Sequence, residues 1–229
     1  MFRKDRQRRQ RRVAEFQKFL KIGPEVLEEF ARRDPRHEYF AGAYAFKILK
    51  GGRSGGIDER ILEVFYGKRA YDQAMEFRDL AGTVIPQVRK RSLVEEGASL
   101  TYHRLDNGAV LCFLRPAAAE GYRREEETVI LRHIGSPKRL HSKHVLKTHW
   151  NHFMSYCEVT SLDGDPTLLD RARVGYILLT RKRLINGVWK TRRIVTGAKY
   201  AIYFLLAVGL NGFVVALIQA YVSFKSQNP

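Results

Sequence analysis

Histidines are concentrated in one short stretch of this chain. Of the seven histidines, His141, His144, His149 and His152 lie within twelve residues, and Cys157 follows soon after. Histidines three or four apart lie on one face of a helix, so His149 and His152 could share a zinc ion. No paired carboxylate or HExxH sequence completes a zinc signature. The pattern leaves two interpretations open: a zinc site at His141, His149 and His152 with no other cofactor indicated, or an amphipathic helix with surface and partly buried imidazoles.

A second candidate for chemistry is the pair formed by Arg139 and His144, which are separated by four residues. This Arg-x4-His spacing resembles the HEPN family of ribonucleases, in which an arginine and a histidine from two protomers act on the RNA phosphate. The resemblance covers six residues and implies an alternative function, a membrane-tethered ribonuclease. A metal-dependent hydrolase that uses the histidine cluster is another alternative. No nucleophile signature is present, so we expect a protein that is not an enzyme.

Positive charge is the dominant feature of the composition. The chain has 229 residues and a net charge of +17, and its balance of hydrophobic and charged residues is that of a folded protein. Two cysteines are too few for a disulfide framework, which fits a reducing compartment. Residues 1–21 carry nine basic and two acidic side chains, and residues 181–199 carry seven basic and no acidic ones.

These two segments are the expected binding sites for an anionic partner, which could be nucleic acid, a nucleotide or a lipid headgroup. The alternative is that the basic residues solvate the protein and flank a membrane segment. The candidate anion-binding residues are Arg6, Arg8, Arg9, Arg11, Arg12, Arg181, Lys182, Arg183, Lys190, Arg192 and Arg193.

Residues 200–224 contain no charged side chain. A helix of this length would be about 37 Å long and would cross a hydrocarbon core of about 30 Å. Basic residues are concentrated on its N-terminal side, so the positive-inside rule predicts a cytoplasmic N-terminal domain and a short non-cytoplasmic tail at 225–229. The sequence therefore predicts a single-pass, tail-anchored membrane protein.

One side of this expected membrane helix is small and polar. Small residues at a spacing of four let helix backbones approach closely, and Asn or Gln can donate hydrogen bonds between helices. The sequence therefore predicts a homo-oligomer that assembles in the membrane. The candidate oligomerisation residues are Gly209, Asn211, Gly212, Ala216, Gln219 and Ala220.

The elements that position these residues divide into a helical and a sheet-rich part. A basic amphipathic arm over residues 1–22 is expected to end at Gly23-Pro24. It precedes a cytoplasmic α+β domain over 23–195. This domain is expected to be helical over 23–92, with helices at 37–50 and 57–88, and sheet-rich over 99–195. Hairpins are expected around Asp106-Asn107-Gly108 and around Asn186-Gly187, with strands at 100–105, 109–114, 174–185 and 188–195. A further strand is expected at 128–133 and a helix at 144–156.

The fold class expected is therefore α+β, with N-terminal helices followed by an antiparallel sheet with an inserted helix and then one C-terminal transmembrane helix. By layout alone, a small basic domain joined to an associating membrane helix suggests a sensor or effector, such as a bacterial stress or antiviral defence protein that perturbs the membrane. An inert membrane scaffold is a further alternative.

Overall fold

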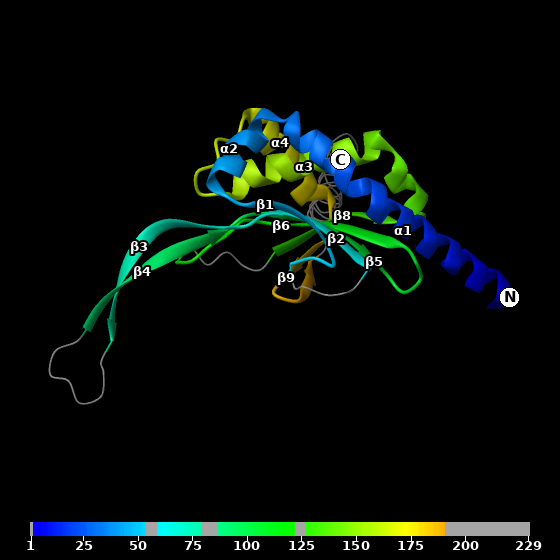
Figure 1. Ribbon diagram of the computed structural model, residues 1–229, viewed down its shortest axis with the longest axis horizontal. Helices are drawn as coiled ribbons and strands as arrows, with labels where there is room; N and C mark the ends of the chain where they lie inside the picture. Colours follow the sequence, from blue (N-terminus) through cyan, green and yellow to red (C-terminus); the bar gives the residue numbers. More distant parts are fainter. Residues whose placement is uncertain (1, 54–58, 79–86, 122–126, 191–229) are drawn as a thin grey trace, which may run out of the picture. The chain divides into compact units, whose positions relative to one another are not determined.

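Helices cover one face of an antiparallel sheet in this protein (Figure 1). The computed structural model describes residues 2–53, 59–78, 87–121 and 127–190, which belong to one compact unit ending at Lys190. The helical layer consists of α1 (Phe2–Arg32), α2 (Pro35–Ala43), the short 3-10 helix η1 (Pro137–His141), α3 (Lys143–Thr160) and α4 (Leu168–Thr180).

The larger sheet has the strand order β1-β2-β5-β6-β8-β9-β10, with antiparallel pairing throughout the described residues. Its strands are β1 (Phe46–Lys50), β2 (Ile61–Tyr66), β5 (Ser99–Arg104), β6 (Val110–Arg115), β8 (Glu127–Ile134), β9 (Arg183–Ile185) and β10 (Val188–Lys190). A second sheet pairs β3 (Lys68–Arg78), β4 (Gln87–Glu96) and β7 (Ala118–Ala119). Figure 1 shows β3 and β4 as a two-stranded ribbon that reaches away from the helices.

The hydrophobic core lies between the helices and the inner face of the larger sheet. Trp150 and Phe153 of α3 are fully buried there, and the ring of Phe19 from α1 packs edge-on against Tyr102 of β5 at 5.1 Å. The buried residues of α1 recur at helical spacing, so one stripe of this otherwise polar helix belongs to the core. The C-terminal half of α1 is therefore held by packing against the domain, and its first turns extend from this anchored part.

The expected break at Gly23-Pro24 is wrong, because α1 continues through both residues to Arg32. Proline within a helix costs about 3 kcal/mol. Phe19 on one side and Leu27 on the other are both buried in the same core, and Gly23 lies directly against the Phe19 ring. Burial of large apolar side chains, at about 1.5–3 kcal/mol each, outweighs the cost of the proline.

The helix expected over 37–50 is confirmed only in its first half, because α2 ends at Ala43 and β1 follows. The helix expected over 57–88 is wrong for the residues that the structure describes there, which lie mainly in β2 and β3. Strand β2 lies between β1 and β5, and β5 is distant in sequence. The backbone hydrogen bonds that make this segment a strand rather than a helix are therefore partly non-local. The expected strand over 174–185 is wrong over most of its length, since α4 runs to Thr180, and only its end, Arg183–Ile185, is a strand. A capping box between Thr167 and Asp170 starts this helix.

Several expectations for the second half are confirmed. The hairpin of β5 and β6 turns at Gly108, where φ is +75°, and β8 and α3 cover the expected strand and helix. Asn186 and Gly187 both have positive φ, as a type I′ turn requires. The fold is thus a mixed α+β fold with N-terminal helices and an antiparallel sheet.

Within the described residues, no helix has the length and apolar character needed to cross a membrane. The expected membrane helix at 200–224 and the tail at 225–229 lie outside these residues, as do residues 191–195.

Candidate anion-binding site

The basic residues near the N-terminus lie on exposed helical turns. Residues 5–12, called here the basic turns, belong to α1, and the side chains of residues 5–11 are all exposed. They include no apolar residue, so the helix is polar on every side at this point. Figure 1 shows this end of α1 extending past the sheet. The five arginines of the basic turns are Arg6, Arg8, Arg9, Arg11 and Arg12.

The position of these arginines in the helix concentrates positive potential. A helix N-terminus carries a partial positive charge, and acidic residues rather than arginines stabilise it. Asp5 is the acidic side chain of this first part of α1, and it forms an exposed ion pair with Arg8 at 2.8 Å. Neighbouring arginines three and four positions apart repel one another. A bound anion would relieve this repulsion.

The turn between β5 and β6 fixes the direction of the basic turns. Arg12 donates a hydrogen bond to the backbone oxygen of Asn107 at 3.3 Å. A Cβ atom on Gly108 would lie 2.7 Å from the Cβ of Arg12, so this glycine permits both the turn and the close approach of α1. Asp106 and Asn107 line a shallow hollow together with arginines of the basic turns. The sequence had indicated only the hairpin at these positions.

The second basic segment is divided by the structure. Lys182 and Lys190 are exposed, and Arg181 is half-buried. Arg183 is only 7% exposed and forms an ion pair with Glu127 at 2.9 Å, which neutralises its charge. Arg192 and Arg193 lie outside the described residues. The described part of this segment therefore presents fewer cations than the sequence suggested.

A further basic run was not among the anion-binding residues expected from the sequence. Arg89, Lys90 and Arg91 are exposed on β4, within the ribbon. Arg91 pairs with Glu120 at 3.2 Å. The run of three adjacent cations was visible in the sequence, but its location on a projecting strand depended on the pairing of β3 with β4.

The four clustered histidines are dispersed between surface and core. His141 lies 3.0 Å from the backbone oxygen of Glu15 through its Nε2 atom, whereas His144 is exposed at the start of α3. His149 is buried, with Nδ1 at 3.2 Å from the hydroxyl of Tyr102. Among the described residues, no group of three or more His, Cys, Asp or Glu is arranged to hold a metal ion.

Burial controls the protonation of the two inner histidines. Burial lowers the pKa of His149 to about 4, assisted by the nearby His152 and Arg132. Burial also lowers the pKa of His152 to about 4, with smaller contributions from two arginines. Both imidazoles are therefore neutral at pH 7. Burial likewise raises the pKa of the Cys112 and Cys157 thiols, which makes them poor nucleophiles.

Arg139 and His144 are both at the surface. Arg139 belongs to η1 and His144 to the first turn of α3, and both side chains are exposed. No hydrogen bond or ion pair between these two described residues is present. The candidate oligomerisation residues Gly209, Asn211, Gly212, Ala216, Gln219 and Ala220 lie outside the residues that the structure describes.

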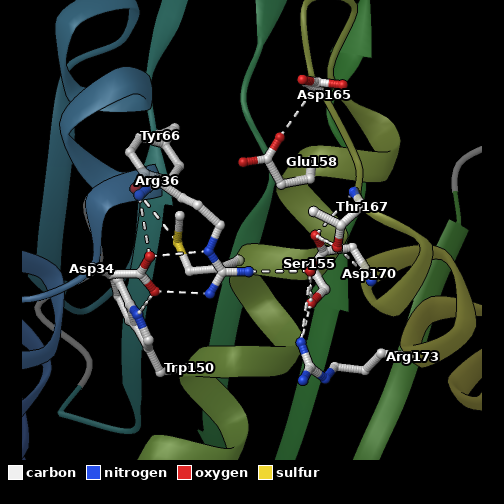
Figure 2. A network of polar contacts seen from close by, with 11 residues as sticks. Asp34, Arg36, Tyr66, Trp150, Ser155, Glu158, Asp165, Thr167, Asp170 and Arg173 are labelled. Carbon is white, nitrogen blue, oxygen red and sulfur yellow. Dashed lines mark hydrogen bonds and ion pairs between the residues drawn. The ribbon is translucent and has the colours of Figure 1, made fainter.

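A buried polar network joins the helices (Figure 2). Arg36 forms two hydrogen bonds to the carboxylate of Asp34 and one to Asp170, and the Trp150 indole donates to Asp34 at 3.0 Å. Ser155 donates to Asp170 at 2.6 Å. Burial opposes ionisation of Asp34, but the hydrogen bonds from Arg36 and Trp150 outweigh it and hold its pKa below the usual range. Because the carboxylates are satisfied within the protein, we assign this network a structural role.

Comparison with known proteins gives no relative: no protein-family model matches the chain, and no curated protein or solved structure is significantly similar to it. The function proposed below therefore rests on the sequence and the geometry of this chain alone.

Proposed function

We propose that this chain is a membrane-attached, non-enzymatic protein that binds nucleic acid through the basic turns of α1. The observation that carries the proposal is the run of exposed arginines at the projecting, electropositive end of a helix that the domain holds in place. Arginine is suited to this role because its guanidinium group can bind phosphate with two parallel hydrogen bonds.

Nucleic acid fits the basic turns better than a lipid surface does. A helix that lies in a membrane interface needs an apolar face to insert among the lipids. Residues 5–12 have no apolar side chain, and the buried stripe of α1 that begins at Phe16 is already used by the core. A helix with arginines on all sides suits nucleic acid, because the phosphodiester backbone presents regularly spaced negative charges to it.

Membrane attachment is proposed from the uncharged segment at 200–224, which is long enough to span a bilayer. The same segment carries the small and polar residues that support self-association. Together these features support a sensor or effector that concentrates a nucleic-acid-binding domain at the cytoplasmic face of a membrane.

The test replaces Arg6, Arg8, Arg9 and Arg11 by Ser in the full chain, held in neutral detergent micelles. Arg12 is retained because it contacts Asn107. Each lost phosphate contact lowers the slope of log K against log salt by about 0.9 for duplex DNA, so affinity and salt dependence should both fall. Binding to labelled duplex DNA and to single-stranded RNA is measured by fluorescence anisotropy.

A matched control removes four exposed cations elsewhere on α1 and beyond its end: Lys18, Lys21, Arg32 and Arg33, each replaced by Ser. This variant has the same net charge as the test variant and should keep most of the affinity. Equal loss in both variants would mean that only total charge matters. Binding of the parent chain to anionic vesicles, with none to either nucleic acid, would contradict the proposal.

A further inference from the structure

The outer face of α4 is apolar, and none of the residues that the structure describes covers it. Leu168, Leu169, Tyr176 and Leu179 are 85%, 65%, 58% and 48% exposed. With successive residues about 100° apart, these four side chains and the exposed Ala172 occupy one continuous arc of about 100°. The opposite face of α4 is the one that the core uses, through Val174 and Ile177. A continuous apolar stripe on the outside of a helix indicates an interaction surface.

Gly175 gives a second indication on the same helix. Glycine in a helix interior reduces helix stability and is retained where the backbone must approach another group closely. A Cβ atom at Gly175 would meet nothing within 4 Å, so the fold of this chain does not require the glycine. Gly175 adjoins the stripe, and Ala172 lies within it. Small residues at these two positions would allow a second helix to pack closely against the middle of α4.

The spacing of the stripe matches a helix pair. Leu168, Ala172, Gly175 and Leu179 follow one another at intervals of four, three and four residues, which is the seam spacing of two packed helices. The pattern is also symmetric about its midpoint between Arg173 and Val174. If two copies of α4 packed antiparallel about that point, Leu168 would face Leu179 and Ala172 would face Gly175.

Charges at the two ends of α4 select the antiparallel arrangement. The exposed Asp165 lies just before the helix, and the exposed Lys182 lies just after it. Antiparallel packing places the acidic end of one helix beside the basic end of the other and also pairs opposite ends of the two helix dipoles. Parallel packing would place like charges together at both ends.

We propose that a second copy of this chain docks on α4, so that the two α4 helices pack antiparallel about a two-fold axis between Arg173 and Val174. The interface is isologous, with the same stripe contributed by both copies. This surface lies on α4 and shares no residue with the basic turns of α1, so the proposed docking does not rest on the proposed nucleic-acid binding.

Cysteine cross-linking of the full chain tests the arrangement. The native Cys112 and Cys157 are buried, so a single added cysteine dominates disulfide formation. At a rise of about 1.5 Å per residue, the two copies of residue 172 would be offset along the helix axis by only about 4.5 Å, whereas the two copies of residue 168 would be offset by about 16.5 Å, too far for a disulfide. Ala172→Cys should therefore link to itself, while Leu168→Cys and Leu179→Cys should link only when mixed with each other.

Equal self-linking at 168, 172 and 179 would indicate parallel packing and overturn the proposal. The absence of links at all of these positions would overturn it as well. Trp189→Cys, exposed on β10, is the control for random collision and should not link.

A second variant separates docking from folding. Gly175→Leu has room in the single chain, so thermal unfolding should not be impaired, but it should weaken association by more than about tenfold by separating the helices. Met75→Leu, at an exposed position on the ribbon, is the control and should leave association unchanged. Dimer dissociation is measured by dilution in analytical ultracentrifugation. Unchanged association of Gly175→Leu would contradict the proposal.

Discussion

His149 illustrates how burial fixes the chemistry of a single residue. It is 3% exposed and lies beside Tyr102 and Cys112, with no carboxylate bonded to its ring among the described residues. Its pKa of about 4 lies below the value of about 6.5 in an unfolded chain. Between these values the unfolded chain binds more protons than the folded one, so stability falls as the pH decreases.

We predict that His149 makes the fold sensitive to acid. Protonation linkage at this residue should cost about 2 kcal/mol of unfolding free energy between pH 7.5 and pH 5. Urea unfolding of the full chain at the two pH values measures the loss, and His149→Gln should reduce it. The same pH dependence in the parent chain and in His149→Gln would show that other groups are responsible.

At the scale of elements, the polar network of Figure 2 connects α3 and α4 to the junction of α1 and α2. Arg36 lies in the first turn of α2 and reaches both Asp34, the N-cap of that helix, and Asp170 at the start of α4. The two carboxylates are nearly inaccessible to water, with side-chain exposures of 5% each. Arg36 therefore compensates two buried negative charges and holds helices together that are far apart in sequence.

Replacing Arg36 by Leu should destabilise the fold by about 3–5 kcal/mol, because Asp34 would remain buried without a cation and Asp170 would keep only its longer ion pair with Arg173 at 3.6 Å. The neighbouring Arg33 offers a matched control. It is 73% exposed and pairs with Glu29 on the surface, so Arg33→Leu should cost about 1 kcal/mol or less. Chemical denaturation of both variants provides the comparison. Similar losses in the two variants would exclude a special role for the buried network.

At the scale of the whole molecule, the chain combines a basic α+β domain with an uncharged segment of membrane-spanning length at 200–224. The concentration of cations before this segment predicts that the domain faces the cytoplasm. A topology experiment needs one reporter on each side of the segment. Cys157 is not a suitable reporter, because it is buried in the folded domain.

We predict opposite accessibility for two introduced cysteines in sealed membranes. Ser226→Cys, beyond the apolar segment, should react with an impermeant maleimide added on the non-cytoplasmic side. Trp189→Cys, which is 60% exposed on β10, should react only from the cytoplasmic side. The parent chain, with both native cysteines buried, gives the background. Reaction of both cysteines from the same side would disprove the predicted topology.

The sequence by itself determined the features that depend on composition or on a few adjacent residues. The positive charge of residues 5–12 and the uncharged run at 200–224 can be counted directly. The turns at Gly108 and Gly187 follow from the positive φ that these short hairpins require. The helix at α3 follows from a local period. These features could be predicted because their causes are local.

The tertiary structure decided everything that depends on partners distant in sequence. Strand β2 exists because it pairs with β5, and α1 passes through Pro24 because residues on both sides of the proline enter one core. The same packing buried His149 and paired the buried Arg183 with Glu127, whereas other histidines and basic residues nearby in the sequence stayed exposed. Periodicity cannot reveal such outcomes, because the free energy that decides between helix and strand, or between surface and core, comes from contacts formed only on folding.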